Sequence, residues 1–287
     1  MKDALLSVTG LSAGAGDKKI LHDIDLAVEP GTTHVLMGPN GAGKSTLGQV
    51  IMGNPAYTRT AGSIELAGED ITERSVPERA RAGLFMSFQA PVEVPGVPLS
   101  SFLRAIAAQH EERLNLRGKR YKKRVAEIME QLSMDPSYLS RELNVGFSGG
   151  EKKKVEMLQL LLLQPKLAIL DETDSGLDVD ALNVVSRAIA VYRAECDGTI
   201  LLITHNTRIL EHLPVDRTHV MVRGHLAAES DASMIADIDA NGFEQFEVFE
   251  DEPAEAPAAN GEGESSSFDA SAVLARAEAA LASAEAR

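Results

Sequence analysis

The sequence predicts an α/β fold with a mixed, largely parallel core sheet, a small antiparallel β subdomain and a helical subdomain. The first observation is a glycine-rich string, GPNGAGKST at residues 38–46, between the apolar run 33–37 and the helix-like run 47–52. The second is an alternation of helix-like and buried strand-like segments after residue 147, which is typical of parallel sheets covered by helices. The strands of that alternation are expected at 167–170, 199–204 and 219–223.

The first part of the core is expected to span residues 1–92. Strands are expected at 5–9, 20–28, 62–67 and 84–88. The first two should flank an exposed turn at 13–19, because that stretch is rich in glycine and charge. With 62–67 they make the small antiparallel sheet, whereas 84–88 is a buried strand that leads to Gln89.

A helical subdomain is expected over residues 93–146, where a loop rich in proline and glycine gives way to helical patterns. Apolar residues there recur at helical spacing and form two short faces. These faces comprise Leu103, Ile106 and Ala107, and then Val125, Ile128, Met129 and Leu132. The basic run 117–124 between them is either a solvated helix start or a docking site for an acidic partner or for the acidic tail.

The core is expected to resume over residues 147–249, before an acidic tail at 250–287. Residues 250–267 are too polar and too rich in proline and glycine to bury a core, so the tail is predicted to be disordered. Residues 269–287 contain helix-forming side chains with a weak apolar stripe, which favours a terminal helix. The stripe comprises Val273, Leu274, Ala277 and Leu281.

Composition narrows the class of protein. The 287 residues carry a formal net charge of −15, which disfavours binding to nucleic acid or to an anionic membrane surface. The most apolar segment, 155–170, is interrupted by polar residues and falls short of the roughly 20 apolar residues that cross a bilayer. The first residues lack the pattern of a signal peptide. We therefore expect a cytoplasmic protein without direct membrane insertion.

The glycine-rich string predicts a nucleotide site. Its glycines allow the loop to turn backbone N–H groups toward phosphate oxygens, at the positive end of the helix dipole. Lys44 can reach the β and γ phosphates, Ser45 can bind Mg²⁺, and Thr46 can hydrogen-bond the α or β phosphate. The residues expected to contact ATP here are Gly38, Pro39, Asn40, Gly41, Ala42, Gly43, Lys44, Ser45 and Thr46.

Two carboxylates are expected beside this loop. Asp171 and Glu172 follow the apolar run 167–170 and so lie at the carboxyl edge of a buried strand, where ligands bind in open α/β sheets. Asp171 can hold Mg²⁺ directly or through water, and Glu172 can act as general base toward the attacking water. General-base catalysis contributes roughly 10² to 10⁴ in rate.

A second glycine pair opens a helix at residues 147–154, FSGGEKKK, and predicts another anion site. With this string the sequence resembles the ABC superfamily of ATPases, over about residues 5–224. The signature motif of that family is matched by residues 148–151, its Q-loop by Gln89, its D-loop by residues 175–178, which end at Asp178, and its switch histidine by His205.

The resemblance implies an ATP hydrolase whose sites lie between two chains arranged head to tail. The signature residues 148–150 of one chain would contact the γ-phosphate held by Lys44 and the P-loop of a second copy in the ATP-bound state. Asp178, in the D-loop, joins the implied set of nucleotide-binding residues.

The resemblance also implies roles near the γ-phosphate. Lys44, Mg²⁺ and His205 would stabilise the charge on this group, and Gln89 would orient the attacking water together with Glu172. The implied metal-binding set is Ser45, Gln89 and Asp171.

Within the superfamily, three strings resemble the SufC family, the ATPases of the Suf system for iron–sulfur cluster assembly. They lie at residues 85–96, 144–153 and 171–178. The resemblance implies homologues of SufB and SufD, which form the scaffold for cluster building, as partners. The alternative is the ATP-hydrolysing subunit of a membrane ABC transporter, because such a subunit shares the fold and the motifs.

Two expectations concern details of the site. Lys152 or Lys153, early in the helix after the signature motif, is expected to pair with Glu172 at rest. No aromatic residue precedes Tyr57, although ABC ATPases often stack adenine on an early aromatic residue. Without a stacking contribution of roughly 1–3 kcal/mol, ATP affinity should be modest and base discrimination poor.

Overall fold

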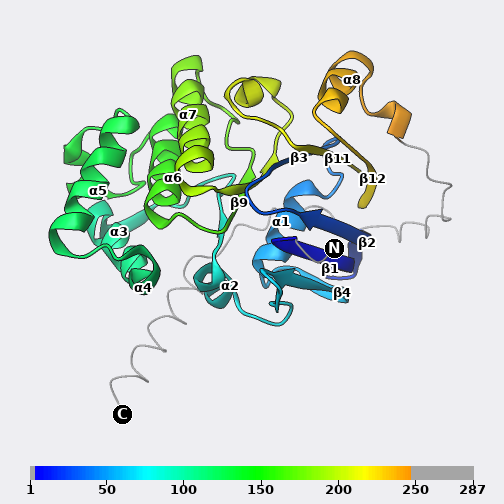
Figure 1. The fold of residues 1–287 in the computed structure, drawn as a ribbon, viewed down its shortest axis with the longest axis horizontal. Helices are drawn as coiled ribbons and strands as arrows, with labels where there is room; N and C mark the ends of the chain where they lie inside the picture. The colour runs from blue at the N-terminus through cyan, green and yellow to red at the C-terminus, as the bar shows by residue number, and fades with distance from the viewer. Residues whose placement is uncertain (1–3, 247–287) are drawn as a thin grey trace, which may run out of the picture. The chain divides into compact units, whose positions relative to one another are not determined.

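A six-stranded sheet forms the centre of residues 4–246, the part of the chain that this computed structural model describes (Figure 1). Its spatial order is β12-β11-β3-β10-β9-β6, and only β12 is antiparallel to its neighbour. The strands are β3 (Thr33–Met37), β6 (Leu84–Met86), β9 (Leu167–Asp171), β10 (Thr199–Ile203), β11 (Arg217–Val222) and β12 (His225–Ser230). The predicted mixed core sheet is therefore confirmed, and β12 is a strand that the sequence reading missed.

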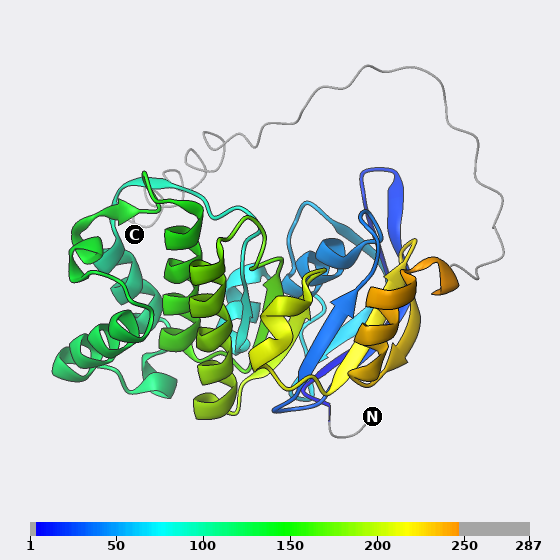
Figure 2. The same ribbon diagram turned by 90° about the horizontal axis from the view of Figure 1, so that it is seen from above.

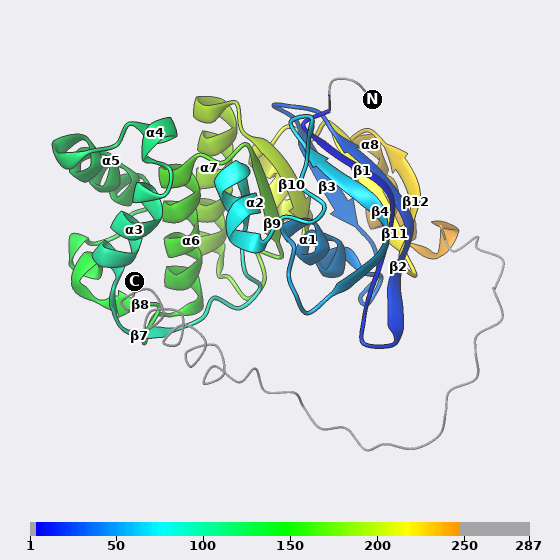
Figure 3. The ribbon, with the colours of Figure 1, turned by 90° about the horizontal axis from the view of Figure 1, so that it is seen from below.

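The two faces of this sheet bury different sets of side chains, because successive residues of a strand point to opposite faces. Ile169, Leu201 and Ile203 pack with helix α1 (Lys44–Met52) and the small sheet. Leu170 and Leu202 instead pack with helices α6 (Gly149–Leu163) and α7 (Val179–Cys196). Figure 2 shows α6 and α7 side by side over one face, and Figure 3 shows α1 between the two sheets.

The small antiparallel sheet has the order β2-β1-β4-β5. Its strands are β1 (Leu6–Ala15), β2 (Lys18–Val28), β4 (Thr58–Leu66) and β5 (Glu69–Asp70). The exposed turn predicted at 13–19 is wrong in extent, because Ala15 pairs with Lys18 and only two residues turn. Gly16, with a φ of +56°, supplies the left-handed conformation that lets so short a turn close.

The region predicted to be a helical subdomain contains mainly helices, with two short strands. The elements there are β7 (Val94–Pro98), α3 (Leu99–Ala108), α4 (Glu111–Leu114), α5 (Gly118–Gln131), η1 (Pro136–Ser140) and β8 (Glu142–Leu143). The two predicted apolar faces are confirmed, since Leu103 and Ile128 are fully buried at their centres. The basic run 117–124 is the exposed start of α5, and its docking role stays a prediction.

The remaining elements are α2 (Val76–Ala82), η2 (Thr207–His212), α8 (Ser233–Asn241) and η3 (Glu244–Phe246). Over residues 4–246, no helix combines the length and the apolar character needed to cross a membrane. The predicted disordered tail and its terminal helix lie outside the described residues.

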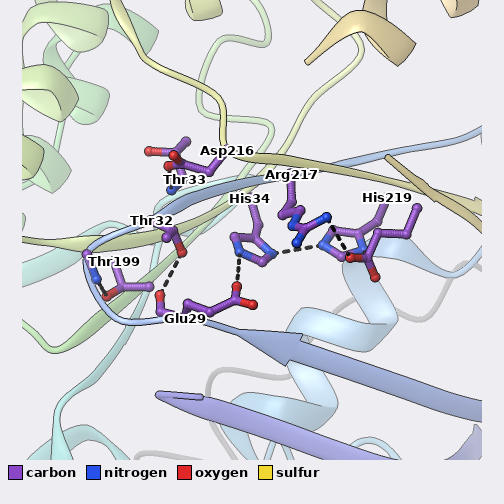
Figure 4. Close-up of polar contacts among 10 residues, drawn as sticks. Glu29, Thr32, Thr33, His34, Thr199, Asp216, Arg217 and His219 are labelled. Atoms are coloured by element: carbon purple, nitrogen blue, oxygen red, sulfur yellow. Dashed lines mark hydrogen bonds and ion pairs between the residues drawn. The ribbon is translucent and has the colours of Figure 1, made fainter. Parts of the chain in front are cut away.

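A buried histidine pair joins β3 to β11 at the end of the sheet where these parallel strands begin (Figure 4). His34 Nδ1 lies 2.8 Å from His219 Nε2, and His34 Nε2 lies 3.0 Å from Glu29 Oε2. His219 Nδ1 is 3.6 Å from Glu229 Oε2, the longest of the three gaps. Burial lowers the pKa of both histidines, so both rings are neutral and each has one N–H group. Two hydrogens are therefore available for the three contacts. We place these hydrogens in the two shorter contacts.

We predict that His219 makes stability fall in mild acid. Burial, His34 and Arg217 lower its pKa to about 3. The unfolded chain takes up this proton near pH 6.5, as an unperturbed histidine does, and the folded chain does not. Stability is therefore fully present above that pH and should fall by about 1.4 kcal/mol per pH unit below it for this histidine alone.

Urea unfolding between pH 7.5 and 5 measures this slope. A His219→Gln variant keeps a side-chain donor toward His34 but cannot titrate. It should be less stable than the native chain at pH 7.5 and should lose less stability on acidification. Equal slopes for the two proteins would contradict the assignment.

Candidate active site

The P-loop connects β3 to α1 and lies tightly against β11. Gly38 has a φ of +150°, and a Cβ there would come within 2.1 Å of the Met221 carbonyl oxygen. Gly43, with a φ of +104°, is the N-cap of α1. These two positions therefore require glycine, and they set the loop at the carboxyl end of β3.

A buried arginine holds the other end of α1. Arg79, from α2, donates from Nη1 to the carbonyl oxygens of Val50 and Ile51, at 3.0 and 2.6 Å. Its Nη2 donates to the Thr72 carbonyl oxygen at 2.7 Å. Because the last carbonyls of a helix have no partners within the helix, this guanidinium caps α1 and fixes its position under the loop.

Lys44 folds back over the P-loop. Its Nζ donates to the carbonyl oxygens of Gly38 and Pro39, at 2.7 and 2.9 Å, and only 6% of the residue is exposed. Burial lowers the pKa of Lys44, while the charges of Glu172 and Asp171 act in the opposite direction. A cation is thus held beside the loop that the sequence predicts to bind phosphates.

Ser45 and Asp171 meet although 126 positions separate them. The Ser45 hydroxyl donates to Asp171 Oδ1 at 3.0 Å, and the Asp171 backbone N–H donates to the Ser87 hydroxyl at 2.9 Å. Burial raises the pKa of Asp171, and the nearby Glu172 adds to this shift. A buried carboxylate beside a hydroxyl is the oxygen pair that a hard divalent cation prefers.

Glu172 is held in a left-handed backbone conformation, with a φ of +46°. Its backbone N–H donates to the Ile203 carbonyl oxygen at 2.9 Å, which ties it to the end of β10. Its Oε2 accepts a hydrogen bond from Gln89 Nε2 at 2.9 Å. Non-glycine residues in this conformation cluster at functional sites.

The expected pairing of Glu172 with Lys152 or Lys153 is wrong. Lys152 Nζ lies 2.8 Å from Glu93 Oε1, and Lys153 Nζ lies 2.9 Å from Glu156 Oε2. The partner of Lys152 lies in the loop after Gln89 and that of Lys153 lies on α6 itself. The resting partner of Glu172 is therefore the neutral amide of Gln89.

One cleft of about 640 Å³ collects most of the predicted residues. Those on its wall are Asn40, Gly41, Gly43, Lys44, Ser45, Thr46, Gln89, Glu172 and His205. Of the others, Gly38 and Pro39 bond Lys44, Ala42 bonds the β11–β12 turn through Gly224, and Asp171 bonds Ser45. Like those four residues, the remaining predicted residues also do not line this cleft, namely Ser148, Gly149, Gly150 and Asp178.

Those four residues instead stand at the starts of two neighbouring helices. Ser148 is the N-cap of α6, and its hydroxyl accepts a hydrogen bond from the Glu151 N–H at 3.3 Å. Glu151 Oε2 in turn accepts from the Ser148 N–H at 2.7 Å, which completes a capping box. Asp178 caps α7 by accepting from the Ala181 N–H at 2.7 Å. A Cβ on Gly150 would lie 3.1 Å from the Ala181 Cβ, so the two helix starts are in contact.

The cleft also has a wall that the sequence reading missed. It comprises Lys18, Lys19, Ile20, His22, Arg223 and Gly224. The Gly224 N–H donates to the Ala42 carbonyl oxygen, and the His22 N–H donates to the Gly224 carbonyl oxygen, both at 2.9 Å. The β11–β12 turn therefore ties the P-loop to β2. The only signal for this wall was Gly224, directly after the strand predicted at 219–223.

The fold and the cleft define a P-loop nucleotide hydrolase. The family described as ABC transporter matches residues 21–175, which is more than half of the chain. The chain is 45% identical over 245 residues to "Vegetative protein 296" of Bacillus subtilis (strain 168), covering 85% of this chain and 94% of that protein. It is 41% identical over 254 residues to "Probable ATP-dependent transporter ycf16" of Pyropia yezoensis, covering 85% and 98%.

Solved structures agree with this assignment. A structure described as the ATP binding subunit of an ABC transporter has a TM-score of 0.69 and 28% identity, covering 82% of this chain and 93% of that one. A dimeric structure of the cassette MJ0796 bound to ADP and Pi has a TM-score of 0.68, covering 79% and 98%, and at 17% identity it supports the fold alone. The chain belongs to the ABC transporter family and is an ABC-type ATP hydrolase.

We predict weak discrimination between purine bases. Among the described residues that line the cleft, no phenylalanine, tyrosine or tryptophan is present, and β2 contributes Lys18, Lys19, Ile20 and His22. Displacement of a fluorescent ADP analogue should give dissociation constants for ATP and GTP within about ten-fold, because contact with the face of a base does not distinguish adenine from guanine. A 100-fold preference for ATP would contradict this prediction.

Proposed function

We propose that this ATPase hydrolyses Mg-ATP between two copies arranged head to tail and thereby drives conformational change in a SufB/SufD-type scaffold during iron–sulfur cluster assembly. The observation that supports the paired site is the separation described above. Lys44 and Glu172 line the cleft, whereas residues 148–150 and Asp178 do not. A second chain would supply these helix starts, whose N–H groups suit a phosphate.

Within one chain, Lys44 and His205 stabilise charge on the γ-phosphate, and Glu172 is the general base. Gln89, already bonded to Glu172, positions the attacking water. Magnesium fits the donors present, because Ser45 and Asp171 bring a hydroxyl and a carboxylate within 3.0 Å and Gln89 adds an amide oxygen. When bound, Mg²⁺ supplies charge neutralisation on the phosphate oxygens.

The Suf assignment rests on strings that also touch in space. Asn144 Nδ2 donates to the Val92 carbonyl oxygen at 2.9 Å, and Lys152 pairs with Glu93 at 2.8 Å. Strings 85–96 and 144–153 therefore build one continuous surface. Phe88 and Val92 expose 58% and 57% of their area on it, which suits contact with a partner protein.

A second candidate is the ATP-hydrolysing subunit of a membrane ABC transporter. The name of the Pyropia yezoensis relative, a probable ATP-dependent transporter, favours it. Both candidates use the same site chemistry and differ in the partner. In either case we propose a cytoplasmic chain that binds no nucleic acid and does not itself insert into a membrane.

We expect Glu172→Gln to leave ATP affinity nearly unchanged and to lower hydrolysis by about 10²-fold or more, since the change removes the base and keeps the shape. Lys44→Ala should instead weaken ATP binding itself. Glu127→Gln, which removes an exposed carboxylate that pairs with Lys123 on α5, is the matched control and should keep the native rate. Native turnover by Glu172→Gln would mean that another group is the base.

We expect the isolated full chain to sediment as a monomer and to hydrolyse ATP slowly, because each site lacks the helix starts of a second copy. Affinity capture from the native cytosol and membrane fractions tests the partner. Recovery of soluble SufB and SufD homologues that raise turnover would support the Suf role. Recovery of a polytopic membrane protein would support the transporter role, and a stable nucleotide-free dimer with full activity would contradict the paired site.

A further inference from the structure

A buried ion pair on α6 lies against the segment that leads to Gln89. Lys153 Nζ and Glu156 Oε2 are 2.9 Å apart, and their side chains are only 5% and 4% exposed. The residues are three positions apart, so both lie on one face of the helix that begins at the signature serine.

Both charged groups also bond the backbone of one residue, Phe88. Lys153 Nζ donates to the Phe88 carbonyl oxygen at 2.6 Å, and the Phe88 N–H donates to Glu156 Oε1 at 2.7 Å. The Phe88 carbonyl belongs to the peptide group shared with Gln89, and that group is planar. Its orientation therefore fixes the direction of the Gln89 N–Cα bond, from which the side chain reaches Glu172 Oε2 at 2.9 Å.

Stability alone gives little reason for this pair. Removing two charges from water carries a desolvation cost that can exceed their attraction, and apolar replacements of buried pairs are often neutral or stabilising. The cost is visible at Glu156, where burial raises the pKa against the opposing effect of Lys153. What apolar side chains could not supply is one donor and one acceptor for the two backbone groups of Phe88.

We propose that Lys153 and Glu156 are positioning residues that hold Gln89 on Glu172 and so link the signature helix to the water-orienting groups of the same chain. This inference rests on the proposed role of Gln89 beside the general base. Any shift of α6 relative to the core sheet would be transmitted through the Phe88 peptide to the Gln89 amide.

The test is a Lys153→Met/Glu156→Leu double variant of the full chain. It removes both contacts to Phe88 and leaves no buried charge unpaired, so the chain should fold, with a thermal stability lowered by the two Phe88 backbone groups that lose their partners. We expect KM for ATP to stay within about two-fold and kcat to fall by about 10- to 100-fold, the range for a misplaced catalytic group. Lys123→Met/Glu127→Leu removes an exposed ion pair of α5 by the same substitutions and should keep the native kcat.

A cycle with Gln89→Ala separates positioning from general damage. If the pair acts through Gln89, adding the double variant to Gln89→Ala should change kcat by less than about two-fold, whereas independent effects would multiply. Multiplied losses, a native kcat in the double variant, or a native kcat in Gln89→Ala would each overturn the proposal. The Glu172→Gln experiment tests a different assignment. Native turnover in that variant would refute Glu172 as the base and would leave the result of this cycle unchanged.

Discussion

Five parallel strands end at one edge of the central sheet, and this shared edge decides where the groups of the cleft lie. Gln89 follows β6, Glu172 follows β9, His205 follows β10, the P-loop follows β3 and Arg223 follows β11. Because paired strands lie about 4.8 Å apart, groups distant in sequence become neighbours without long side chains. The bond from the Glu172 N–H to the Ile203 carbonyl oxygen extends this pairing one residue beyond β9 and places the carboxylate over the edge.

The same architecture keeps the signature serine out of the cleft. Helix α6 packs with α7 on the face opposite α1, so its first turn cannot stand over the P-loop of its own chain. The Ser148 hydroxyl caps α6 by accepting a hydrogen bond from the Glu151 N–H. The Glu151 carboxylate in turn accepts a hydrogen bond from the Tyr138 hydroxyl. These hydrogen bonds preform the helix start, as the proposed contact with a phosphate on a second copy requires.

The sequence predicted those parts of the site that depend on local chemistry. The P-loop, with its glycines at Gly38 and Gly43, and the strand ending at Asp171 are encoded in short strings, and the structure places them as expected. The partner of Lys153 was predicted wrongly, because which carboxylate lies nearest depends on how α6 packs on the segment before Gln89. Strand β12 was missed for a similar reason. Its residues are only partly buried, and pairing with β11 alone makes them a strand.

Two buried polar pairs at different ends of the sheet show how position decides what such a pair can do. His34 and His219 lie at the beginnings of β3 and β11, far along the strands from the cleft, and both are neutral at physiological pH. Their hydrogen bonds join two strands that already pair. The burial of these two histidines therefore affects the stability of the fold and not the geometry of the cleft. Lys153 and Glu156 lie beside the opposite edge and bond a backbone outside any helix or strand. The Phe88 peptide has no hydrogen bonds of a sheet or helix to orient it. For this reason a charged pair at that edge can set the geometry of the next residue, Gln89.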